Sequence, residues 1–457
     1  MKGKILPSLS FSALFSACML CQQAFGTVFH ADDALKPPEK PQTSFTLESY
    51  LNAYLSKSPQ VRSEKNTLEN ALANYKNAFI NAFLPSFSLS ATASKTYSRY
   101  NKPGDLDEMS HFNSSGQTSG TWNLFNSGKD LLSYKSSFLE YKASKIDFDS
   151  FIQETVLSAV QKYYTLLLNK KLVDVYRSDF QIAKKQYEQD KKLYDNGLKT
   201  RSDLLSSETN YLSSQLSLFS AQNNYSNALT AFNLPLNQPG ETEVKLDDKT
   251  DQSCINMPNL DKDLAKALEH RHDARKRRLL LQQKEIQLKS GKRNTLPSVF
   301  ANLSASYGRS FDHHESWDYS YGALVGISFD LGFFYADKKN IRQNLERNYE
   351  NAKLSHEQFL RDMRDDVVQK RNALELKTQS LKISELRMKA ATKKFEATQL
   401  KYKNGIMSAT DLTVARQEMI SAQVNHATLI TELAVAKLRY RYATGENIFD
   451  FSSEDMQ

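Results

Sequence analysis

Two long stretches of the chain contain neither glycine nor proline, and they constrain the fold more than any other feature. They cover residues 129–196 and 333–404, which are 68 and 72 residues long. Glycine and proline are the residues that most often end a helix. A continuous helix of this size would be on the order of 100 Å long, because each residue adds about 1.5 Å. The two stretches therefore predict very long helices that pack side by side, as in coiled coils.

A short motif at the end of each stretch occurs twice. "YDNGLKTRSDLL" occupies residues 194–205 and "YKNGIMSATDLT" occupies residues 402–413, so the two copies lie 208 residues apart. Further matches at the same shift extend through the chain, for example Tyr141 with Tyr349. This pattern predicts a tandem duplication of a unit of roughly 200 residues. In each unit the motif joins a very long helix to a shorter returning helix.

Each half also contains segments in which apolar and small polar residues alternate with a period of two. This alternation predicts four strands, at about residues 85–100, 112–126, 297–309 and 316–331. The polar stretches between them, residues 100–113 and 308–316, are expected to be water-exposed hairpin loops. Each half is thus expected to run helix, strand, loop, strand, long helix, turn and helix.

Strands with one apolar and one polar face have two interpretations, a soluble sandwich or a transmembrane β-barrel. Aromatic residues near the strand ends favour the barrel, because such residues mark the membrane interface. These residues are Tyr97, Tyr100, Trp122, Tyr307, Trp317 and Tyr319. Four strands cannot close a barrel, and open edges in hydrocarbon would leave backbone groups unpaired. The chain must then oligomerise: two copies would give eight strands, and three would give twelve with room for a lumen.

The N-terminus has the pattern of a secretory signal peptide, with an expected cut after Gly26. Lys2 and Lys4 form a basic start, and an apolar stretch and small residues follow. A buried helix is the alternative. Cys18 is a candidate for lipidation, although the residues before it match the lipoprotein pattern poorly. Without this segment the mature chain keeps only Cys254 and cannot form an internal disulfide.

Charge and motif content argue against several function classes. The formal net charge is +8, and basic and acidic residues are interleaved along the chain, which indicates a solvated surface and no nucleic-acid partner. The adjacent His313 and His314 are expected to be polar loop surface, so no metal site and no cofactor are predicted. No phosphate-binding loop or nucleophile constellation is present in the sequence, so no catalytic residue and no enzyme activity are predicted.

These features divide the chain into six segments. They are a signal peptide (1–26), an N-terminal linker (27–44), a first repeat (45–232), an inter-repeat linker (233–259), a second repeat (260–445) and a C-terminal tail (446–457).

The chain resembles the TolC-type outer-membrane efflux family in four features taken together. They are the signal peptide, the tandem repeat, the two β-hairpins flanked by long helices and the Tyr-x-x-Gly…Asp turn. The resemblance extends from about Phe45 to Gly445. It implies a mainly helical fold with a β-barrel part: a homotrimer with a twelve-stranded barrel in the outer-membrane lipid, four strands from each chain, above a periplasmic α-barrel of long helical hairpins.

The same resemblance implies a function. The protein would be the passive exit duct of a tripartite efflux or type I secretion system, joined to a periplasmic adaptor and an inner-membrane pump. The alternative is a structural periplasmic coiled-coil protein without a pore, which leaves the four strands unexplained.

The repeated motif has a structural explanation. Gly197 and Gly405 are expected to take the left-handed conformation that ends a helix. Thr200 and Ser408 then cap the next helix in a capping box, in which an aspartate three residues later takes part.

The resemblance adds a functional interpretation of the motif. It implies that Asp411 from three chains rings the closed pore mouth, and that Tyr402, Asp203 and Tyr194 belong to the pore gate. Met407 and Val414 stand where better-studied members carry an arginine and a second aspartate. The gate pattern is therefore only partly present. Capping is an equal alternative to the pore ring for Asp411, and it is the preferred explanation of Asp203.

The resemblance also implies a docking surface, and the strand pattern itself predicts which aromatic residues lie at the lipid interface. Gly197, Leu198, Gly405 and Ile406 match the tips that dock the adaptor; the alternative for Leu198 and Ile406 is a hydrophobic staple within the hairpin. Aromatic residues at the lipid interface are expected at Tyr97, Trp122, Tyr307, Trp317 and Tyr319.

Overall fold

The computed structural model describes residues 44–102, 105–247, 259–293, 296–310, 317–329 and 335–449. The expected signal peptide with Cys18, and also Cys254 and the pair His313 and His314, lie outside the described residues.

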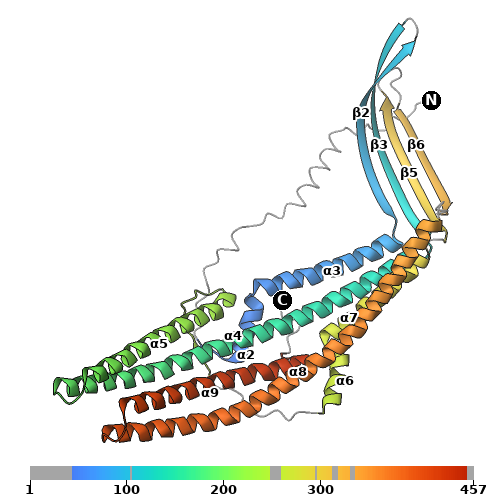
Figure 1. Ribbon diagram of the computed structural model, residues 1–457. Helices are drawn as coiled ribbons and strands as arrows, with labels where there is room; N and C mark the ends of the chain where they lie inside the picture. The colour runs from blue at the N-terminus through green and yellow to red at the C-terminus, as the bar shows by residue number, and fades with distance from the viewer. Residues whose placement is uncertain are drawn as a thin grey trace. The chain divides into compact units, whose positions relative to one another are not determined.

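The described elements occur in the same order in both halves of the chain (Figure 1). The first half contains α2 (Leu47–Lys57), α3 (Pro59–Phe83), β2 (Ser86–Lys102), β3 (Asp105–Asn126), α4 (Lys129–Asp195) and α5 (Arg201–Asn233). The second contains α6 (Leu260–His270), α7 (His272–Lys292), β5 (Ser298–Ser310), β6 (Trp317–Ser328), α8 (Tyr335–Lys403) and α9 (Ala409–Ala443). The long helices α4 and α8 have 67 and 69 residues, in agreement with the two stretches that lack glycine and proline.

Short elements surround the junction of the two halves. The 3-10 helix η2 (Leu234–Leu236) follows α5, and the two-residue strands β1 (Ser44–Phe45) and β4 (Lys245–Leu246) pair in parallel. They cover a core in which the buried ring of Tyr50 stacks on that of Phe232, with centroids 4.0 Å apart.

The first β-hairpin is longer than the sequence predicted. The polar sequence predicts a loop over residues 100–113, but β2 and β3 remain paired up to Lys102 and Asp105. Polar composition was a poor guide here, because antiparallel pairing satisfies the backbone N–H and C=O groups whatever the side chains are.

The four-stranded sheet has the order β2-β3-β5-β6, and all its neighbours are antiparallel. The register aligns Leu89 with Thr118, Thr118 with Ala305, and Ala305 with Tyr321. Because side chains alternate between faces, the apolar positions of all four strands share one face. The most exposed side chains of this face are Phe87, Leu89, Tyr97, Tyr319, Tyr321, Val325, Ile327 and Phe329.

The opposite face of the sheet is polar. Ser88 and Ser119 are hydrogen-bonded through their hydroxyls at 2.7 Å, and Ser306 and Ser320 at 2.8 Å. On β3 the register shifts between Asn123 and Phe125. This bulge aligns Phe125 with Val299 on the apolar face, next to Trp122. Strands β2 and β6 form the two edges of the sheet.

None of the described helices is both long enough and apolar enough to cross a membrane.

Candidate functional site

The turns that follow α4 and α8 have the same backbone geometry. Gly197 and Gly405 have φ angles of 71° and 73°. The N–H of Gly197 donates to the carbonyl of Tyr194 and the N–H of Leu198 to that of Leu193, both at 2.8 Å. Gly405 and Ile406 repeat these bonds after α8. Each turn is thus a Schellman motif, which confirms the left-handed helix ends that the sequence predicted.

The helices that follow the turns begin with the predicted capping boxes. The backbone N–H of Asp203 donates to the hydroxyl of Thr200 at 3.2 Å, and that of Asp411 donates to Ser408 at 3.1 Å. In return, each carboxylate accepts hydrogen bonds from its capping residue. The side-chain hydrogen bonds from Thr200 and Ser408 lower the pKa of both carboxyl groups below the ordinary value, so both are ionised at neutral pH.

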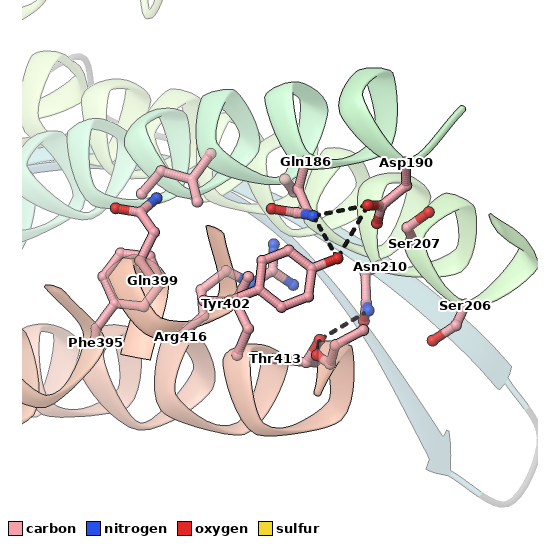
Figure 2. A pocket seen from close by; sticks show the side chains of 14 residues that line it. Gln186, Asp190, Ser206, Ser207, Asn210, Phe395, Gln399, Tyr402, Thr413 and Arg416 are labelled. Atoms are coloured by element: carbon pink, nitrogen blue, oxygen red, sulfur yellow. Dashed lines mark hydrogen bonds between the residues drawn. The ribbon is translucent and has the colours of Figure 1, made fainter. Parts of the chain in front are cut away.

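A polar cluster around the buried Asp190 lies one turn before the end of α4 (Figure 2). Asp190 is 1% exposed. Its Oδ1 accepts hydrogen bonds of 3.0 Å from Nε2 of Gln186 and from the hydroxyl of Tyr402 on α8. The ammonium group of Lys199, from the turn after α4, bonds to both Asp190 and Tyr402. This cluster links the α4–α5 hairpin to the α8–α9 hairpin.

The protonation states in the cluster favour the link. Burial raises the pKa of the Tyr402 phenol, so that it stays protonated and donates. Burial would lower the pKa of Lys199, but its hydrogen bonds to Asp190 and Tyr402 raise it above the ordinary value. Lys199 is therefore a cation beside the carboxylate of Asp190.

A small cavity of about 30 Å³ lies next to Tyr402 between the two hairpins. Arg416 on α9 also lines this cavity, and its Nη1 lies 3.5 Å from Oδ1 of Asp179 on α4. Both side chains of this ion pair are buried. Asn210 on α5 donates to the hydroxyl of Thr413 on α9 at 3.2 Å, which adds a third polar link between the hairpins.

The structure separates the expected gate residues into two groups. Tyr402 belongs to the buried cluster with Asp190 and Lys199, whereas Asp411 is exposed at the start of α9. Asp203 is half-buried, and Tyr194 is exposed at the end of α4. Within the part of the chain that the structure describes, Asp411 and Tyr402 are not hydrogen-bonded to each other.

Sequence reasoning did not assign a role to Asp190 or Lys199. A signal for Lys199 was present, because the 208-residue shift aligns it with Met407. Lys199 therefore places a cation at the position of the first turn that is equivalent to Met407 in the second. Asp190 carried no such signal, because its contact with Tyr402 spans 212 residues.

The tip residues are strongly exposed. Leu198 and Ile406 have 73% and 71% of their surface accessible, which argues against the alternative of a hydrophobic staple. A groove of about 750 Å³ lies between the two turns, and Leu198, Lys199 and Met407 are among the residues that line it.

The aromatic residues expected at the lipid interface occur at both ends of the apolar face. Tyr97, Tyr307 and Tyr319 are exposed at the end that carries the hairpins, where Trp317 pairs with Arg309. Trp122 lies at the end from which the helices leave, and its indole N–H donates to the carbonyl of Phe83 at 3.1 Å.

The chain has two long helical hairpins, one in each half, and a sheet with one exposed apolar face. This arrangement defines a class of protein that combines a membrane-embedded sheet with a helical duct. The family model for outer membrane efflux proteins matches residues 50–237 and 264–446. The chain belongs to the outer membrane efflux protein family.

Solved structures of channels share this fold. The outer-membrane channel CmeC of Campylobacter jejuni is 19% identical with a TM-score of 0.71, and the match covers 88% of this chain and 87% of that one. VceC of Vibrio cholerae is 17% identical with a TM-score of 0.71, covering 88% and 97% of the two chains. The open state of MtrE of Neisseria gonorrhoeae is 16% identical with a TM-score of 0.70, covering 88% and 89%. No curated protein matches the chain.

Family membership establishes the location and the general activity. The chain is an outer-membrane efflux channel with a large periplasmic part, and it is not an enzyme. The alternative of a periplasmic coiled-coil protein without a pore is not supported by the family or by the fold.

Proposed function

We propose that three copies of the chain close a single twelve-stranded barrel in the outer membrane. The observation that supports this proposal is the pair of open edges, β2 and β6, on a sheet whose one face is apolar. Within hydrocarbon, unpaired backbone groups cost several kcal/mol each, so each β2 edge must pair with a β6 edge of another copy. Two copies would enclose a lumen filled by side chains, whereas three leave room for a passage.

The helices of the three copies would continue this passage into the periplasm. Each chain contributes the antiparallel pairs α4–α5 and α8–α9, so three copies supply twelve helices around one axis. The Schellman turns and capping boxes then form the periplasmic end of the duct.

This end is the proposed gate. The contacts of Asp190, Lys199 and Tyr402 hold the α4–α5 hairpin against the α8–α9 hairpin and thus favour the closed state. Asp411, with its lowered pKa, contributes one carboxylate per chain to a ring at the pore mouth, and Asp203 and Tyr194 lie on the neighbouring turn.

The same end is the proposed docking surface for a periplasmic adaptor, which connects the duct to an inner-membrane pump. Gly197 and Gly405 place Leu198 and Ile406 at the exposed tips, and Leu198 also lines the groove between the turns. Exposed apolar side chains beside a groove are typical of a protein-binding surface.

The oligomeric state is tested by extracting the outer membrane in mild detergent and measuring the protein mass by light scattering, corrected for detergent. We expect a mass near three mature chains. A mass near two chains would contradict the proposed lumen, and a monomer would contradict the shared barrel.

The docking surface is tested separately. Replacing Leu198 and Ile406 together by serine should abolish export while the trimer remains intact. The matched control is Leu234→Ser, which changes a similarly exposed leucine on η2, far along the chain from both turns. Export at the wild-type level in the tip variant would show that the docking assignment is wrong.

A further inference from the structure

Two cations interrupt the apolar face of the sheet. The described side chains of this face on the four strands are apolar or small, or are tyrosine or threonine, except for Lys95 on β2 and Arg309 on β5. Lys95 is exposed and Arg309 is half-buried. Placing a charged side chain in hydrocarbon costs free energy. The position of the two cations along the strands therefore indicates whether they lie in hydrocarbon or at the membrane interface.

The register gives this height. Arg309 is aligned with Ser114, and Ser114 with Ala93, so Lys95 lies two residues further toward the hairpin end. Ten residues separate Val299 from Arg309, which corresponds to about 33 Å along a strand. A strand tilt of about 40° converts this length into about 25 Å along the membrane normal, the height of the apolar band of membrane barrels. Both cations therefore lie where the apolar band ends.

The surroundings of the cations are those of a membrane interface. Tyr307 and Tyr319 are paired across β5 and β6, two residues from Arg309 on the side away from the hairpin. Nζ of Lys95 lies 5.0 Å from the ring centre of Tyr97. Tyrosine is enriched at the level of lipid headgroups, and long basic side chains extend toward them.

Chain connectivity identifies the leaflet. The helices α3, α4, α7 and α8 adjoin the sheet at the end opposite the β2–β3 hairpin. Since the helices form the periplasmic part, the end that carries Lys95 and Arg309 lies in the outer leaflet. This step depends on the proposed placement of the sheet in the membrane.

We propose that Lys95 and Arg309 form a binding site for the phosphate groups of an outer-leaflet lipid. The two residues are two strands and two residues apart, which corresponds to about 12 Å between their Cα atoms. This distance suits two phosphate groups on one headgroup. The guanidinium group binds a phosphate through paired hydrogen bonds, and the ammonium group binds as a compact charge.

The test uses the full-length protein in neutral detergent, titrated with fluorescently labelled lipid A, a lipid that carries two phosphates. We expect the double variant Lys95→Gln, Arg309→Gln to bind at least tenfold more weakly than the wild type, and each single variant to lie in between. The charge-preserving variant Lys95→Arg, Arg309→Lys should retain binding. The matched control is Lys76→Gln, which removes an exposed positive charge from α3.

Several outcomes would overturn the proposal. Equal binding by the wild type and the double variant would exclude these residues as the site. Complete displacement of lipid A by millimolar inorganic phosphate would indicate a site for a free anion and contradict a lipid site. Fractionation and mass measurement of each variant distinguish a failure of the lipid-site proposal from a failure of the barrel proposal. A failure of the barrel proposal would remove the wild type from the outer membrane or change its mass.

Discussion

The hydroxyl of Tyr402 on α8 donates a hydrogen bond of 3.0 Å to Oδ1 of Asp190 on α4. The two residues come from different repeats, and the ammonium group of Lys199 contacts both. Their bond crosses the space between the two helical hairpins beside a small cavity (Figure 2). A link of this kind ties the positions of the two hairpins together at the end of the molecule where we place the gate.

Replacing Tyr402 by phenylalanine keeps the ring but removes this hydrogen bond and those that the hydroxyl accepts from Gln186 and Lys199. A hydrogen bond of this kind contributes about 1 kcal/mol, so the balance between closed and open tips should shift about fivefold toward the open state. We expect a corresponding rise in the conductance of single channels in planar bilayers. The matched control is Tyr187→Phe, because the ring of Tyr187 stacks on Tyr211 of the same hairpin. Equal conductance in the wild type and Tyr402→Phe would show that the bond does not hold the gate.

The lowered pKa of Asp411 predicts how the channel responds to acid. The side-chain hydrogen bond from Ser408 lowers this pKa below its ordinary value of 3.8. A carboxyl group with a lowered folded pKa contributes stability above its ordinary pKa and loses it as the pH falls through the lowered value. Asp411 therefore stays charged from pH 7 to pH 5, and cation selectivity should be constant over this range and decline only below about pH 4.

Reversal potentials in a potassium chloride gradient measure this selectivity. Asp411→Asn should reduce it at pH 7 while preserving the turn, because the asparagine side-chain oxygen still accepts hydrogen bonds. The ring assignment would be wrong if selectivity in the variant equalled that of the wild type. A change in cation selectivity between pH 5 and pH 7 would show that a group other than Asp411 determines it.

The turns at the tips and the long helices are the features that the sequence predicts correctly. The Schellman turns and capping boxes could be predicted, because Gly405 and the pair Ser408 and Asp411 are local signals within one turn of helix. The long helices could be predicted for a similar reason, since nothing in residues 129–196 or 333–404 ends a helix.

Contacts between distant segments could not be predicted in the same way. The pairing of Asp190 with Tyr402 depends on how two helices pack 212 residues apart, and no local pattern encodes it. The extension of β2 and β3 to Lys102 and Asp105 was also missed, because backbone pairing imposes few demands on side chains in water.

The left-handed conformation of Gly405 predicts a specific pattern of tolerated substitutions. At a φ angle of 73°, any residue with a Cβ atom is strained, and no neighbouring atom lies within 4 Å of an added Cβ. Gly405→Ala should therefore destabilise the protein by about 1 kcal/mol through backbone strain alone. Gly405→Asn should cost less, because asparagine tolerates this conformation. Thermal unfolding followed by circular dichroism measures both; equal losses for alanine and asparagine would contradict the assigned cause.

The buried pair of Asp179 and Arg416 predicts an asymmetry between single and double replacement. Arg416→Met leaves the carboxylate of Asp179 buried without its partner, which typically costs about 3–5 kcal/mol. The double variant Asp179→Leu, Arg416→Met removes both charges and should recover most of this loss. Thermal unfolding of the two variants at pH 7 measures the difference.

The pH dependence of the Arg416→Met variant provides an independent check. Burial already raises the pKa of Asp179 in the wild type, where only Arg416 opposes the shift. Without Arg416 the raised pKa means that the folded state binds a proton more readily than the unfolded state, so stability falls as the pH rises above about 4. The melting temperature of Arg416→Met should therefore increase when the pH is lowered from 7 to 5, whereas that of the double variant should change much less. Identical pH profiles would show that Asp179 is not the group left unpaired, and that the loss comes from packing around the cavity.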